Sequence, residues 1–77
     1  MTPAQCRAAR GMLKWTQDDL ATKAAVSVLT IRNFEAEKSE PRRATLASMQ
    51  RALEAANVEF TDGGVRLRDD RPAVASA

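Results

Sequence analysis

The chain has 77 residues, which is enough for one small hydrophobic core and too few for two. Its 44% hydrophobic and 29% charged residues are typical of a globular domain, while a single cysteine and no histidine exclude a disulfide framework, the usual zinc sites and His-based catalysis. The formal net charge is only +2. Residues 38–57, however, carry four basic and two acidic side chains, so a weakly basic chain can still have a local basic surface.

A first helix is predicted over residues 3–13. Thr2 supplies a hydroxyl cap, Pro3 suits the first helical position, and Gln5 completes a Thr-x-x-Gln capping box. The apolar positions at three- and four-residue spacing form one buried stripe, which consists of Cys6, Ala9 and Leu13. Cys6 is therefore expected to be a small buried hydrophobe rather than a redox sensor.

Two further short helices are predicted close together. Thr16 caps a helix that ends near Ala24, and Ser27 caps the next one only a few residues later. In this third helix, Ile31 and Phe34 have the spacing of inward-facing residues. The opposite, outward face then carries Val28, Leu29, Arg32 and Asn33.

A loop and a fourth helix follow. Residues 37–43 break the helical periodicity with serine and proline and are predicted to form the loop. Residues 44–56 consist of good helix formers and place Leu46, Met49, Leu53 and Ala56 on one face.

The pattern changes to a β-hairpin after residue 57. Residues 58–60 and 65–67 alternate apolar and polar, and the sequence TDGG between them is typical of a turn. A lone hairpin is marginal in water, so we expect it to pack on the helices or to pair with a strand of a partner. Residues 69–77 lack periodicity and are predicted to be a disordered tail. The expected fold is mainly α, with four to five helices in residues 1–57 and a hairpin in residues 58–68.

The segment WTQDDLATKAAVSVLTIRNFEAEKSEPRRATLASMQRAL resembles the helix-turn-helix domain of the phage repressor and Cro family, also called the XRE family. The resemblance extends from about Gln5 to Ala56. Its markers are Thr16-Gln17, Leu20-Ala21, Val26-Ser27, Ile31, Phe34-Glu35 and the basic, proline-containing loop that follows. It implies a four-to-five-helix, repressor-like fold that binds double-stranded DNA.

The resemblance also implies a set of DNA-binding positions in this chain. They are Gln17, Ser27, Val28, Leu29, Thr30, Arg32, Asn33, Lys38, Arg42 and Arg43. Asn33 can pair with adenine, Arg32 with guanine or a phosphate, and Thr30 with a phosphate or its own helix backbone. Where many relatives carry polar residues, Val28 and Leu29 are apolar, which suggests contact with thymine methyl groups or with a protein. Gln17 and the basic loop could also be a plain helix start and a solvated linker.

Other matched positions are interpreted as structural. Arg10 and Glu35 match a partly buried ion pair between the first and third helices in some relatives. Trp15 matches an apolar core position. Many relatives have glycine where Ala25 stands, because the residue there has a positive φ, and alanine adopts that conformation at a cost of roughly 1 kcal/mol.

These features predict a cytoplasmic transcriptional regulator, and we expect no enzymatic activity, no cofactor and no membrane association. The protein is expected to be a repressor, with control of its own gene as one possibility, that binds a two-fold-related operator as a homodimer. The predicted dimer contacts are Val58, Phe60, Val65 and Leu67, with the end of the fourth helix as a competing surface. The alternative is an antitoxin or antiactivator whose partner is a toxin or an activator. RNA polymerase is a further candidate for the protein partner.

Overall fold

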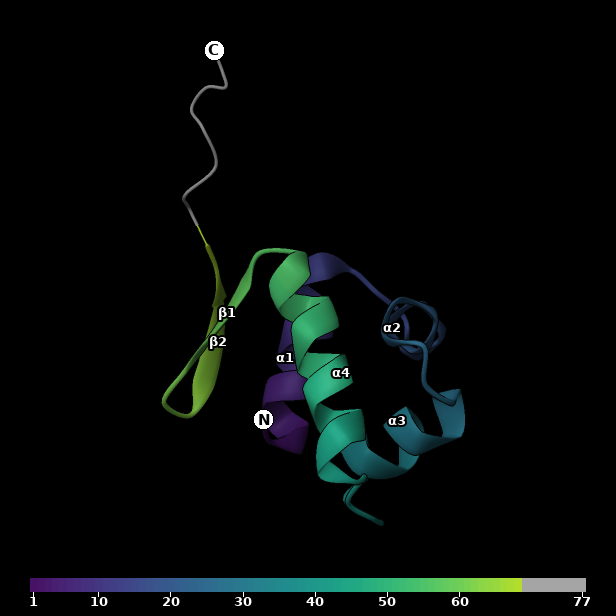
Figure 1. Ribbon diagram of the computed structural model, residues 1–77. Coiled ribbons are helices and arrows are strands. Elements are labelled where there is room, and N and C mark those ends of the chain that lie inside the picture. The colour runs from purple at the N-terminus through teal and green to yellow at the C-terminus, as the bar shows by residue number, and fades with distance from the viewer. Residues whose placement is uncertain (69–77) are drawn as a thin grey trace.

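Four helices and one two-stranded antiparallel hairpin make up the computed structural model, which describes residues 1–68 (Figure 1). The elements are α1 (Pro3–Leu13), α2 (Gln17–Ala24), α3 (Val28–Glu35), α4 (Arg43–Ala55), β1 (Val58–Thr61) and β2 (Gly64–Leu67). The predicted mainly helical fold with a C-terminal hairpin is confirmed, while the predicted tail lies outside the described residues. None of the helices in residues 1–68 has the length and apolar character needed to cross a membrane.

Side-chain caps define the starts of the first three helices. The capping boxes predicted from Thr2 and Thr16 are both present, with Gln5 and Asp19 as the reciprocal partners. Ser27 caps α3 through its hydroxyl oxygen, which accepts the backbone N–H of residue 29 at 3.1 Å. Each cap satisfies a backbone donor that the helix itself cannot pair. The starts of these three helices that the sequence predicts are therefore correct to within a residue.

The first three helices end in the same way, with a residue in the left-handed conformation. Lys14, Ala25 and Glu37 have φ values of 59°, 59° and 61°. In each case the next residue donates a backbone hydrogen bond five residues back, namely Trp15 to Arg10, Val26 to Ala21 and Lys38 to Asn33. Glycine is the usual residue at this position because it has no Cβ to clash, so these three side chains strain the backbone.

Replacing Ala25 with glycine is expected to stabilise the protein by about 0.5–1 kcal/mol. The strain of a left-handed alanine is about 1–2 kcal/mol, and the greater freedom of glycine in the unfolded chain offsets part of the gain. Urea unfolding followed by circular dichroism measures the change. Ala36→Gly is the matched control, because Ala36 has a φ of −85° and no strain to relieve, and it should not stabilise. An Ala25→Gly variant less stable than the wild type would contradict the prediction.

The core lies where α1, α2, α3, α4 and the start of β1 meet. Its fully buried side chains include Cys6, Leu20, Ile31, Met49, Leu53 and Val58, and Ala9, Ala21, Ala24 and Phe34 complete it. Trp15 packs against this core from its edge, as expected, and so does Val26. The predicted inward face of α3 is therefore confirmed for Ile31 and Phe34.

The hairpin packs on the helices of its own chain. Val58 is fully buried, and Phe60 and Val65 pack against the core. The hairpin tip is also fixed to α1, because the buried amide of Gln5 donates to the carbonyls of Thr61 and Gly64 at 2.9 and 3.0 Å. Packing on the helices of the same chain thus stabilises a hairpin that would be marginal by itself.

Candidate nucleic-acid interface

A short helix joined to a second short helix by a tight turn forms the candidate interface. Helix α2 ends at Ala24 and α3 begins at Val28, so only three residues connect them. Val26 packs against the core and holds this turn in place. In Figure 1, α2 and α3 lie on one side of α4 and the hairpin lies on the other.

The outer surface of α3 carries the predicted base-reading side chains. Leu29 is 55% exposed, which makes it the most exposed large apolar side chain in the described part of the chain. Arg32 is exposed, and Thr30 and Asn33 are half-buried. These residues are not needed for the core, so this face of α3 is available to a partner.

Val28 is the exception to the predicted outward face. It is half-buried and packs against the core, so its predicted place beside Leu29 on the outer face is wrong. The reason is helical spacing: Val28 lies three residues before Ile31 and seven before Glu35, and both of these are buried. Val28 therefore occupies the border between the core and the candidate interface.

The start of α4 carries exposed basic residues without a cap. Arg42 is the N-cap residue and makes no side-chain cap hydrogen bond, and Arg43 is the first residue of the helix rather than part of the loop as predicted. Both are exposed, as is Lys38 in the preceding loop. Cations at a helix N-terminus oppose the helix dipole, and the first backbone N–H groups have no side-chain acceptor. An anion bound here would offset the unfavourable positive charges and would accept hydrogen bonds from these N–H groups.

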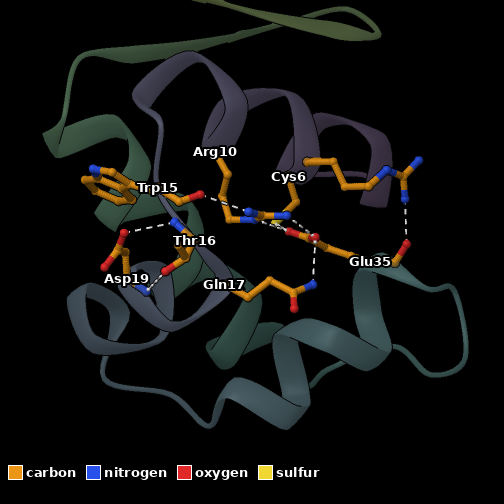
Figure 2. Close-up of polar contacts among 8 residues, drawn as sticks. Cys6, Arg10, Trp15, Thr16, Gln17, Asp19 and Glu35 are labelled. Atoms are coloured by element: carbon orange, nitrogen blue, oxygen red, sulfur yellow. Dashed lines mark hydrogen bonds and ion pairs between the residues drawn. The ribbon is translucent and has the colours of Figure 1, made fainter.

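The carboxylate of Glu35, at the end of α3, accepts hydrogen bonds from side chains of α1 and α2 (Figure 2). Arg10 of α1 donates to it through Nε at 2.7 Å and Nη2 at 2.6 Å. Cys6 of α1 donates through its thiol at 3.1 Å, and Gln17 of α2 through its amide nitrogen at 3.1 Å. The ion pair that the resemblance implied is present, and it belongs to a network that fixes α3 relative to α1 and α2.

Burial and hydrogen bonding act in opposite directions on Glu35. Burial by itself raises the pKa of this carboxyl, but hydrogen bonds from Arg10, Cys6 and Gln17 outweigh it and hold the pKa below its ordinary value. The hydrogen bond to Glu35 raises the pKa of Arg10 further. Burial, followed by the hydrogen bond to Glu35, raises the pKa of the Cys6 thiol far above its ordinary value. The network is therefore built from a charged Glu35 and a neutral Cys6.

These pKa shifts predict that stability falls on both sides of a plateau from about pH 5 to pH 8. The depressed pKa of Glu35 gives stability that is present above the unfolded pKa of about 4.3 and is lost as the pH falls through the folded value. The raised pKa of Cys6 gives stability that is complete below the unfolded pKa of about 8.5 and declines as the pH rises above it, by up to about 1.4 kcal/mol per pH unit.

Urea unfolding at a series of pH values tests this prediction. In a Cys6→Ala variant the decline between pH 8 and pH 10 should shrink markedly, while the acid decline should persist because Glu35 keeps Arg10 and Gln17. An alkaline decline that is the same in the wild type and the variant would show that Cys6 is not its source.

Gln17 lies at the first position of α2 with its side chain tied to Glu35. Its amide nitrogen has two hydrogens, and this bond uses only one of them. The bond also fixes which end of the amide carries the nitrogen. Glu35 thus orients Gln17 as a donor at a helix N-terminus, where backbone N–H groups favour an anion.

Two contacts in this part of the molecule were missed from the sequence. The thiol of Cys6 was expected only to fill space, yet it donates to Glu35 from 29 residues away. Lys23 places its ammonium 5.7 Å from the centre of the Trp15 ring, a cation–π contact between the end of α2 and the segment before it. Neither has a sequence signal, since both join residues whose proximity follows from the fold.

The domain has three features of a DNA-binding helix-turn-helix module. A turn of three residues joins the two helices, the second helix is capped and anchored by Ile31 and Phe34, and the outer face of that helix is exposed. The family model described as helix-turn-helix matches residues 7–56, which is more than half of the chain. The protein therefore belongs to this family, the XRE type of helix-turn-helix proteins. A comparison with curated proteins finds no match.

Proposed function

We propose that this protein is a sequence-specific transcriptional regulator, which binds a two-fold-related operator as a homodimer with α3 in the major groove. The observation that carries the proposal is the outer face of α3, where Leu29 and Arg32 project away from a helix that Glu35 fixes to the rest of the domain. A rigid helix with exposed side chains of different chemistry is what major-groove reading requires.

Each α3 side chain suits a different feature of a base pair. Asn33 has the paired donor and acceptor that match adenine, and Arg32 has the paired donors that match guanine. Leu29 can contact only apolar groups, which in the major groove means the thymine methyl. Because Val28 is half-buried, the thymine contact falls mainly on Leu29.

Phosphate contacts are proposed around this reading surface. Gln17 at the start of α2 and the uncapped start of α4 with Arg42 and Arg43 are the two strongest anchors. The remaining proposed contacts are Ser27, Thr30 and Lys38. Contacts from both ends of the surface would set the depth and angle at which α3 enters the groove.

Repression is the proposed mode of action, since a dimer on an operator excludes polymerase by occupying the promoter. Two recognition helices about one turn of DNA apart combine two modest affinities into a specific one. The gene's own upstream region is the first operator to examine.

The experiment is selection of bound duplexes from a random pool by the full chain, followed by footprinting on the upstream region. The expected result is enrichment of an inverted repeat whose half-sites lie about one helical turn apart. Affinity should fall steeply with salt, because several phosphate contacts release counterions. No enrichment over the starting pool would refute the proposal.

A protein-binding role is the second candidate, favoured by the 55% exposure of Leu29 in the middle of the same surface. An antitoxin or antiactivator would use this side chain to hold a toxin or an activator. Co-expression with the product of the neighbouring gene distinguishes the two functions. A stoichiometric complex that Leu29→Glu abolishes, together with no selected operator, would favour the protein partner.

A further inference from the structure

Leu29 places an apolar side chain at the start of α3, on the surface proposed to face DNA. It is the second residue of the helix, and the hydroxyl oxygen of Ser27 accepts its backbone N–H at 3.1 Å. The side chain is 55% exposed and, unlike that of Val28, it is not among the apolar side chains that pack on the core of residues 1–68. In a helix-turn-helix domain, the first residues of the second helix contact the base edges. The apolar group of Leu29 is therefore fixed where a base would be read.

The charge of α3 indicates what kind of partner Leu29 meets. The helix has one acid, Glu35, which is only 5% exposed and is paired with Arg10. Its other charged residue, Arg32, is exposed. The exposed surface of α3 is therefore positive, and Leu29 lies on it as an apolar group. Such a combination suits a polyanion that presents apolar groups between its charges, which is a description of the DNA major groove.

The apolar group that a base edge offers in this groove is a methyl on C5 of a pyrimidine ring. Thymine always carries it, and cytosine carries the same group at the same ring position after enzymatic methylation. The two bases differ beside the methyl, where thymine has the O4 acceptor and cytosine the N4 donor. The side chain of Leu29 has neither a donor nor an acceptor with which to sense this difference. It can recognise the methyl group, but not the base that carries it.

We propose that Leu29 reads the C5-methyl group of either pyrimidine, so that methylation of a cytosine in the operator strengthens binding by this protein. The inference rests on the proposed function and deepens it, because it names a modification of DNA to which the recognition surface responds. Covering one methyl group changes affinity about fourfold, and two half-sites together give about fifteenfold. Removing the methyl from thymine, which gives uracil, weakens binding by the same factor.

Selection of duplexes by the full 77-residue chain from random pools tests the inference. The pools differ only in their C5-methyl groups, because each combines thymine or uracil with cytosine or 5-methylcytosine. With thymine and cytosine, the position read by Leu29 should be enriched in thymine. With uracil and 5-methylcytosine, the preference at this position should move to 5-methylcytosine, while the positions read by Arg32 and Asn33 keep their bases. With uracil and cytosine, the position should lose its preference.

Affinity for the selected operator, with and without the methyl groups, identifies the side chain responsible. Fluorescence anisotropy should give a ratio of about fifteenfold for the wild type, for thymine against uracil and for 5-methylcytosine against cytosine. In Leu29→Ala both ratios should fall below about twofold, because the truncated side chain no longer covers the methyl. Met12→Ala is the matched control, since it truncates a side chain of α1 that is 41% exposed, and it should keep the wild-type ratios. Circular dichroism should show the same helix content in both variants.

Three results would overturn the inference. A preference that stays with the base when the methyl is moved to cytosine would show that the base is read, and would leave the proposed function intact. A methyl effect that persists in Leu29→Ala would assign the effect to the deformability of the DNA. If no pool yields an enriched duplex, the proposed function fails and the inference fails with it.

Discussion

Replacing Arg10 with methionine is expected to destabilise the protein by about 3–5 kcal/mol. The side chain of Glu35 is only 4% exposed and that of Arg10 18%, and their closest approach is 2.6 Å. Methionine keeps most of the aliphatic stem but leaves a buried carboxylate without its counter-ion. Because a small domain has only a few kcal/mol of net stability, much of the variant should be unfolded at room temperature.

Two other variants separate the cost of a lone charge from the worth of the pair. Arg10→Met combined with Glu35→Met removes both charges and should recover most of the lost stability. Arg66→Met breaks the exposed pair with Glu59, where the side chains are 68% and 43% exposed, and should cost less than about 1 kcal/mol. Urea unfolding gives all three values. An Arg10→Met variant that loses no more than Arg66→Met would show that the buried pair is not formed in solution.

The helix starts and the hairpin could be predicted because they depend on residues close in sequence. Thr2, Thr16 and Ser27 cap donors two or three residues away, and apolar alternation fixes the faces of the two strands. The start of α4 was placed one residue late for a related reason. Ser39 and Pro41 break the helical periodicity in residues 37–43, and a helix boundary inferred from such a break differs from the observed one by a residue or two.

The contacts that could not be predicted join distant segments. Gln5 was expected only as part of a capping box, yet its amide also holds the hairpin tip, 56 residues further on. The burial of Val28 was missed because Leu29, Arg32 and Asn33 suggested one continuous outer face. A helix has a border on each side of its buried stripe, and whether a border residue is covered depends on the neighbouring elements. The exposure of Leu29 and Arg32 could thus be predicted from the sequence, whereas the position of Val28 at the border of the core followed only from the structure.

Replacing Arg32 and Asn33 together with alanine is expected to remove most of the preference for the operator. A paired contact to a base contributes about 1–3 kcal/mol of discrimination, so losing both should weaken specific binding by at least about thirtyfold. The fold should be retained, because Arg32 is exposed and the backbone carbonyl of Asn33, which accepts the N–H of Lys38 at 2.8 Å, is unchanged. Fluorescence anisotropy with operator and scrambled duplexes measures both affinities.

Lys38→Ala is the matched control for this pair, since it removes a proposed phosphate contact from an exposed side chain next to the same helix. It should weaken binding to both duplexes by a similar factor and reduce the salt dependence by about one counterion. The double variant should instead bring the operator affinity close to that for the scrambled duplex. If the double variant keeps its preference for the operator, sequence is not read by Arg32 and Asn33. In that case Leu29, with its contact to thymine methyls, or the deformability of the DNA must supply the specificity.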